Sequence, residues 1–166
     1  MKTPSLQLNS LRDLYIEELH DLYSAETLLL KVLPKMADAA TDTQLKKAFT
    51  EHFEQTENHV ARLEQIFEDL DEKAAGGTCE AMEGLVKEGT HMIKAQGDGV
   101  VRDSGLIGAA QRIEHHEIAG YGTARSLAQR LGEEDAAELL QETLDEEADA
   151  DALLTEIAES QLPVIH

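Results

Sequence analysis

Four long segments with a helical spacing of apolar residues constrain the fold of this chain more than any other feature. Each is about 27 to 30 residues long, which corresponds to a helix of roughly 40 to 45 Å at 1.5 Å per residue. The segments cover approximately residues 11–36, 43–71, 103–131 and 133–160. Ser10 with Asp13 is typical of a helix start, and Pro34 is expected to kink or end the first helix. With three prolines and almost no alternation of β-branched residues, the sequence predicts an all-α protein.

The connections between these segments predict how the helices are arranged. Thr41-Asp42-Thr43 joins the first two helices and Gly132 separates the last two, so each pair is expected to be antiparallel. The stretch between the pairs contains a shorter helix, predicted from near Thr78 to Gln96. Two antiparallel pairs joined by one long crossover predict a ferritin-like four-helix bundle with a short fifth helix in that crossover.

Composition limits the partners and the location that the chain can have. The net charge of −20 disfavours nucleic acid and anionic membranes, because both are polyanions. The single cysteine, Cys79, excludes an intramolecular disulfide and any CxxC metal site. No stretch is apolar over the length of a signal peptide or a membrane span, so we expect a cytoplasmic protein that does not enter a membrane. We expect one domain over residues 1–166, frayed at about 1–7 and 161–166.

Several acidic residues share the apolar faces of three long helices. A carboxylate that points into a core is costly unless a positive charge, a shared proton or a metal meets it. Glu26 lies among the leucines of the first helix, with Glu18 beside it on the same face. In the fourth predicted helix Glu114 and Glu117 are three residues apart and face one side. Glu147 and Asp151 lie on the apolar stripe of the last helix.

The second helix leaves its polar candidates unresolved. The run HFEQTENH, residues 52–59, places His52, Thr56 and His59 on or beside the apolar stripe. Glu57 lies at the opposite edge of the stripe and Glu54 points further away, although together they form a Glu-x-x-Glu pair. The pattern therefore leaves Glu54, Glu57 and His59 as alternative ligands.

These side chains together indicate a site for two divalent metal ions. Any one acidic pair is more typical of a solvated helix surface, but core-facing acids in the middle of several helices would repel one another unless cations entered. Basic residues are scarce on the same stripes: Arg125 lies about two turns, roughly 12 Å, beyond Glu117. Coordination rich in carboxylates favours iron or manganese over copper or a closed zinc site. Iron is the first expectation and manganese the second.

Several motifs of the chain resemble those of the YciF/YciE group, bacterial ferritin-like stress-response proteins. The resemblance extends over almost the whole sequence and is carried by five stretches. These are DLYSAE at 21–26, HFEQTENHVARLEQIF at 52–67, CEAMEGL at 79–85, AAQRIEHHEIAGYG at 109–122 and ETLDEEADAD at 142–151. The resemblance implies a ferritin-like fold, a rubrerythrin-like dinuclear metal site and dimerisation.

Analogy with rubrerythrin assigns roles to individual residues. Glu26 would be the ligand from the first helix, and Glu114 with Glu117 would be the pair from the fourth. The sequence departs from that pattern where Glu54-x-x-Glu57 and Glu147-x-x-x-Asp151 replace two Glu-x-x-His motifs. Fewer imidazole ligands alter the reduction potential of an iron pair, so the departures bear on redox chemistry.

Three functions are compatible with these patterns. The first is a dimetal protein that reacts with peroxide or oxygen, as a rubrerythrin-like peroxidase or in the manner of a manganese catalase. Because the chain has no cysteine-rich module, such a peroxidase would need a separate electron-donor protein. The second is an iron-binding protein that sequesters the metal without catalysis, and the third is a metal-free helical scaffold.

A second apolar face predicts a homodimer. It consists of Leu139, Leu153 and Ile157 on the last helix, with Leu14 and Leu30 of the first helix at the margins.

Overall fold

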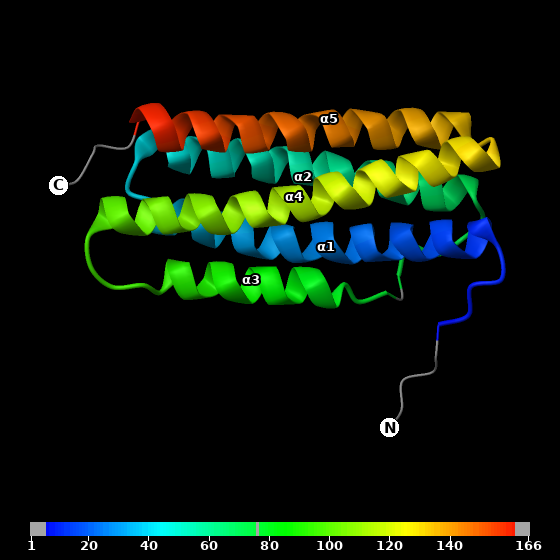
Figure 1. The fold of residues 1–166 in the computed structure, drawn as a ribbon, viewed down its shortest axis with the longest axis horizontal. Helices are drawn as coiled ribbons and strands as arrows, with labels where there is room; N and C mark the ends of the chain where they lie inside the picture. The colour runs from blue at the N-terminus through cyan, green and yellow to red at the C-terminus, as the bar shows by residue number, and fades with distance from the viewer. Residues whose placement is uncertain (1–5, 76, 162–166) are drawn as a thin grey trace, which may run out of the picture.

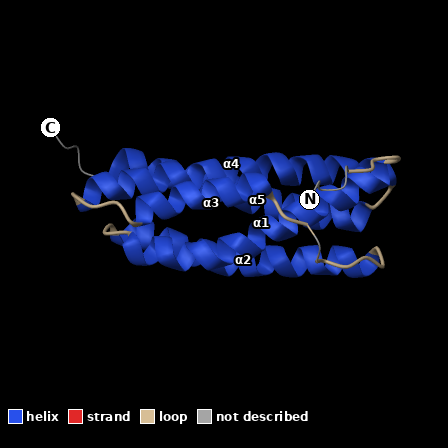
Figure 2. Ribbon diagram, turned by 90° about the horizontal axis from the view of Figure 1, so that it is seen from below, coloured by secondary structure: helices blue, strands red, loops and turns tan. Residues whose placement is uncertain are grey.

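The described part of the chain is all-helical, as the sequence predicts. The computed structural model describes residues 6–75 and 77–161, and no strand occurs among them (Figure 2). The predicted frayed ends at 1–7 and 161–166 fall mostly outside these residues. The helices are α1 (Leu11–Ala39), α2 (Thr43–Asp69), α3 (Glu80–Ile93), α4 (Gly99–Leu131) and α5 (Glu134–Glu156), followed by the π-helical segment η1 (Ile157–Gln161).

Four long helices form a bundle, and the short one lies on its outside. α1 packs against α2 and α4, and α5 packs against the same two helices, so the four helices surround one interior. α3 contacts α1 and α4 from outside the bundle (Figure 1). The segment between α2 and α4 thus runs the length of the bundle and carries α3, as the spacing of the predicted helices indicates. None of the described helices is long and apolar enough to cross a membrane.

The ends of the helices follow from local side-chain chemistry. Ser10 and Asp13 form a reciprocal capping box at the start of α1. Asp98 accepts hydrogen bonds from the first free N–H groups of α4, which therefore begins at Gly99, four residues earlier than predicted. Gly132 ends α4 with φ 78°, a left-handed conformation that glycine adopts without strain. Pro34 does not end α1, which continues to Ala39.

The interior consists of two apolar clusters with a polar layer between them. One cluster contains Leu33, Phe49 and Leu106, and the other contains Leu19 and Phe67. The first is built from the C-terminal part of α1 and the N-terminal part of α2, and the second from the opposite parts of these helices. The polar layer therefore lies near mid-height in the bundle, shielded by apolar packing at both ends.

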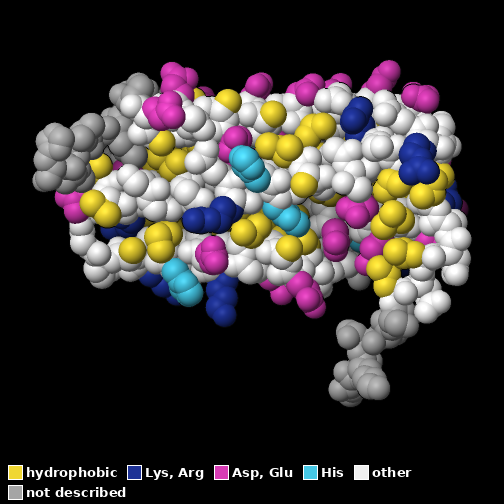
Figure 3. Space-filling model, in the orientation of Figure 1, with side chains coloured by type: hydrophobic (Ala, Val, Ile, Leu, Met, Phe, Trp, Pro, Cys, Tyr) yellow, Lys and Arg dark blue, Asp and Glu magenta, His cyan; other side chains and the backbone are white. Residues whose placement is uncertain are grey.

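The outer surface is strongly acidic, but its predicted second apolar face is smaller than expected. Figure 3 shows Asp and Glu side chains along the edge that α5 forms. Leu153 is 40% exposed, whereas Leu139 is half-buried and Ile157 belongs to an apolar cluster of the core. Ile157 is thus a core residue and not part of an exposed face, because η1 continues α5 and packs against α2.

Candidate metal centre

Six buried carboxyl and imidazole side chains meet in the polar layer. They project from all four long helices, and none is more than 5% exposed. They are Glu26 of α1, His52 and His59 of α2, Glu114 and Glu117 of α4, and Glu147 of α5. The helical period explains the convergence, since residues three, four or seven apart lie on one face of a helix.

Two groups of ligand atoms can be distinguished within this cluster. In the first, His59 Nδ1 lies 3.3 Å from Glu26 Oε1 and 2.9 Å from Glu147 Oε1. In the second, His52 Nε2 lies 3.4 Å from Glu114 Oε1 and 3.4 Å from Glu147 Oε2. Each group has ligand atoms within 4.8 Å of one another, and the second also includes Glu117. Glu147 belongs to both groups and directs one oxygen to each.

Many polar atoms of the cluster make no aligned hydrogen bond. They are both oxygens of Glu117 and of Glu147, Oε2 of Glu26 and of Glu114, Nε2 of His52 and Nδ1 of His59. The close N···O pairs of His52 and His59 satisfy an ion-pair distance but not hydrogen-bond geometry. Buried polar atoms without partners are rare in folded proteins, because desolvation costs about 1–3 kcal/mol for each. Their concentration here marks a site that fits cations.

The electrostatics of the cluster resist full ionisation without a metal. Burial raises the pKa of Glu114 and of Glu147 to about 7, and it raises that of Glu117 well above its usual value. Burial acts to lower the pKa of His59, but the carboxylates of Glu147 and Glu26 outweigh it and raise this pKa to about 10. The metal-free cluster therefore retains protons near neutral pH, and a bound cation would displace them.

Outer side chains hold the imidazole of His59 and the carboxylate of Glu26 in place. His59 Nε2 lies 2.8 Å from Glu146 Oε2, and Arg62 holds both oxygens of Glu146 at 2.7 and 3.0 Å. The hydrogen bond from Arg62 lowers the pKa of Glu146, so this carboxylate stays ionised and accepts a hydrogen bond from the Nε2–H of His59. Nδ1 of His59 therefore faces the cluster, where its lone pair would bind a cation once its proton is displaced. On the other side, the Tyr121 hydroxyl donates to Glu26 Oε1.

Five of the predicted site residues lie in the cluster and three do not. Glu26, His59, Glu114, Glu117 and Glu147 meet there, whereas Glu54 and Glu57 are exposed and Asp151 is half-buried outside it. The structure therefore does not bring Glu54, Glu57 and Asp151 to the group of ligand atoms that the other five form.

Physical reasons account for these three differences. The interior face of α2 is defined by His52, Thr56 and His59. Glu54 is two residues after His52, and Glu57 is two residues before His59, so both point to solvent. Asp151 accepts instead from Gln111 at 3.1 Å and lies 3.1 Å from His115 Nε2.

His52 is the member of the cluster that the sequence prediction omitted. It lies on the apolar stripe of α2. The residues three positions before and after it are Phe49 and Gln55, so no acid at that spacing marks His52 as a ligand. Its seven-residue spacing from His59 is the available signal, since two helical turns return a side chain to the same face.

The fold and the cluster define a class of protein: a helical bundle with a buried carboxylate–histidine site at its centre. Residues 10–163 match the family described as domain of unknown function DUF892, and the chain belongs to this family. It is 42% identical over 154 residues to the protein YciF of Escherichia coli K12, an alignment that covers 92% of this chain and 93% of YciF. The resemblance seen in the sequence motifs is thereby confirmed.

Solved structures show the same fold. The crystal structure of the E. coli stress protein YciF matches with a TM-score of 0.88 and covers 91% of this chain and 96% of that one. YcfI of Rhodopseudomonas palustris is 36% identical, with a TM-score of 0.86 over 93% of this chain and 98% of its own. A protein of Xanthomonas campestris is 22% identical, with a TM-score of 0.73 over 92% and 93% of the two chains, and supports the fold alone.

Proposed function

We propose that this protein is a ferritin-like dinuclear metal protein that holds two ions of iron or manganese and reacts with peroxide or oxygen. The observation that carries the proposal is the shared position of Glu147 between two groups of unpartnered, buried ligand atoms. A carboxylate placed between two imidazoles, with one oxygen toward each, suits a bridge between two cations.

The charges of the cluster match two divalent ions. Its four carboxylates carry four negative charges when ionised, and two neutral imidazoles add none. Among the described residues, no ion pair joins a lysine or arginine to Glu26, Glu114, Glu117 or Glu147, and Arg62 pairs with Glu142 and Glu146 instead. Two divalent cations would therefore neutralise the site without any other counterion.

Each side chain has a distinct task in the proposed centre. Glu26 and His59 would hold one ion, His52, Glu114 and Glu117 the other, and Glu147 both. When bound, an iron or manganese pair supplies two-electron redox chemistry toward a small oxidant. Tyr121 orients Glu26, and Glu146 with Arg62 orients His59, so the ligands are placed before any ion arrives.

The relatives support the remaining parts of the proposal. The matched E. coli protein is named a stress protein, which suits a reaction with an oxidant. We propose a cytoplasmic homodimer that receives electrons from a separate donor protein. A mass in solution that stays monomeric at all concentrations would contradict the dimer.

Metal analysis followed by peroxide kinetics tests the function. Protein purified anaerobically from unsupplemented cells is expected to carry about two ions per chain, and the Glu117→Gln variant fewer. The exposed Glu54 of α2 offers a matched control, since Glu54→Gln should retain the metal. Catalytic turnover of hydrogen peroxide supports an enzyme, whereas a single stoichiometric oxidation supports sequestration. A ferrous protein that reacts no faster than free ferrous ion would end the enzymatic proposal.

A further inference from the structure

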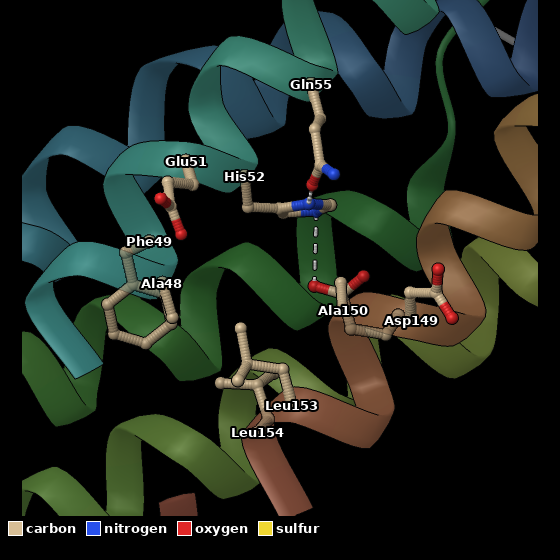
Figure 4. A pocket seen from close by; sticks show the side chains of 10 residues that line it. Ala48, Phe49, Glu51, His52, Gln55, Asp149, Ala150, Leu153 and Leu154 are labelled. Atoms are coloured by element: carbon tan, nitrogen blue, oxygen red, sulfur yellow. Dashed lines mark hydrogen bonds and ion pairs between the residues drawn. The ribbon is translucent and has the colours of Figure 1, made fainter. Parts of the chain in front are cut away.

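A pocket between α2 and α5 opens from the surface onto the candidate metal centre. It has a volume of about 110 Å³, close to that of a few water molecules. Figure 4 shows its apolar side chains, Phe49 on α2 and Leu153 and Leu154 on α5. The pocket is large enough for a small ion with part of its hydration shell, but not for a sizeable organic molecule.

The inner end of the pocket is formed by two members of the cluster. His52 and Glu114 line it, and both are almost completely buried. Nε2 of His52 and Oε2 of Glu114 have no hydrogen-bond partner. Gln55 lies 3.2 Å from Nδ1 of His52, which leaves Nε2 directed at Glu114 and Glu147. The pocket thus ends on ligand atoms that are free to receive a cation.

The outer end of the pocket carries two carboxylates, one of which, Glu51, also pairs with the exposed Lys47 at 3.3 Å. Glu51 of α2 and Asp149 of α5 are exposed and flank His52 from the two helices (Figure 4). A route from the surface inward therefore passes two carboxylates, then an imidazole, then the interior glutamates. A second hollow, between α1 and α4, also has acids at its edge, Glu18 and Asp21, but no residue of the cluster lines it.

We infer that the pocket between α2 and α5 is the port through which divalent cations reach the centre, with His52 as the first interior ligand they meet. This inference rests on the proposed function. Carboxylates at the mouth of a low-dielectric cleft concentrate cations and accelerate their association. The imidazole of His52 would hold an entering cation first, and Glu114 Oε1, which lies 3.4 Å from His52 Nε2, is placed to hold it next.

Stopped-flow binding of Co²⁺ to the full-length protein tests the port, because the visible absorption of Co²⁺ reports its coordination. Ala150 lines the pocket and is half-buried, so Ala150→Phe should fill it. Ala119 lines the second hollow, and Ala119→Phe is the matched control. We expect Ala150→Phe to slow association and dissociation at least about tenfold, with the dissociation constant within about threefold of wild type.

A second pair of variants tests the acidic mouth without changing the interior. Glu51→Gln with Asp149→Asn should slow association about three- to tenfold at low ionic strength, and the difference should vanish in high salt. Glu54→Gln with Asp145→Asn, exposed acids on the same two helices, is the control and should change the rate less than twofold. Circular dichroism confirms that each variant is folded.

The outcomes separate the port from the metal site itself. Slower entry in the two port variants, with both controls at the wild-type rate, supports the port. Wild-type rates in Ala150→Phe and in the Glu51/Asp149 variant, or equal slowing by the controls, overturn the port while leaving the metal site in place. A wild-type protein that binds no Co²⁺, Fe²⁺ or Mn²⁺ overturns the proposed function and the port with it.

Discussion

Two buried acids of α4, Asp103 and Glu117, are treated in opposite ways by the structure around them. Both are fully buried, and they lie about 21 Å apart along the same helix. Asp103 accepts hydrogen bonds from the backbone N–H of Thr41 and Asp42 and from the Thr41 hydroxyl, at 2.6 to 3.1 Å. Neither oxygen of Glu117 has a partner.

The difference separates an acid that the fold itself satisfies from one that belongs to the proposed metal site. The carboxylate of Asp103 is satisfied by protein groups and fastens the α1–α2 turn onto α4. Glu117 gains nothing comparable from the fold, and burial raises its pKa well above the usual value. A buried carboxylate without a protein donor is the kind of group that the proposed cations would neutralise.

The largest expected effect concerns stabilisation by metal. Iron or manganese at 1,000 times its dissociation constant should stabilise the wild-type protein by about 4 kcal/mol, because binding energy adds to folding energy. Glu117→Gln should lose most of this gain, and Glu114→Gln should behave alike. Without metal, both variants should be as stable as wild type or more stable, since each replaces a desolvated carboxyl group that has unpartnered oxygens. Thermal melts with chelator and with excess metal decide it, and equal metal-induced shifts in all three proteins would contradict the dimetal site.

Replacement of Asp103 should give the opposite pattern. In Asp103→Asn the amide –NH₂ faces backbone donors, and we expect a loss of about 3 kcal/mol. The loss should be the same with chelator and with metal, because the α1–α2 turn is remote from the cluster. Urea unfolding under both conditions measures it. A loss of stability seen only in the presence of metal would contradict the different roles assigned to Asp103 and Glu117.

The support of His59 by Glu146 should produce a smaller change. Glu146→Gln removes the charged acceptor that holds the Nε2 proton, so metal affinity should fall about 10- to 100-fold. Glu142→Gln is the matched control, because Glu142 contacts the same arginine, Arg62, from an exposed position. Competition with a chromogenic chelator gives the affinities. Equal affinities in the two variants would show that the Glu146 contact does not tune the site.

The smallest expected effect is on the pH dependence of the free energy of unfolding. In the metal-free protein Glu114 and Glu147 have pKa values of about 7, above the unfolded value near 4.5, so the folded state binds more protons between these limits. Stability should therefore fall as pH rises from about 5 to 7. His59, with a pKa of about 10, adds a further fall above pH 6.5. With metal bound the slope should reverse, because protons compete with the ions for the same atoms. Melts from pH 5 to 8 in chelator and in metal compare the two slopes.

The acids on strongly patterned helices could be identified from sequence because periodicity determines the interior face. Glu26 lies between Leu22 and Leu29, and Glu114 and Glu117 share a face with Ile107 and Ala110, so their burial follows from 3.6 residues per turn. The interior face of α2 could not be assigned in the same way, because its polar candidates point in more than one direction: His52, Glu54, Glu57 and His59. Successive residues of a helix are rotated by about 100°, so one position decides whether an acid faces the interior or the solvent. Because the apolar stripe of α2 has polar residues in its middle, it does not define the interior face to within one position.

The sequence by itself determined the helices, their order, the ends marked by Ser10 and Gly132, and most of the acids that face inward, because these depend on local spacing and on side chains within one turn. Tertiary structure alone decided that Glu147 stands between two histidines seven residues apart, that Asp151 turns to Gln111 and His115, and that a pocket reaches His52. Those features depend on the relative rotation and offset of helices far apart in the chain. The rotation is set by how the side chains of two neighbouring helices pack together, so the sequence pattern of one helix does not predict it.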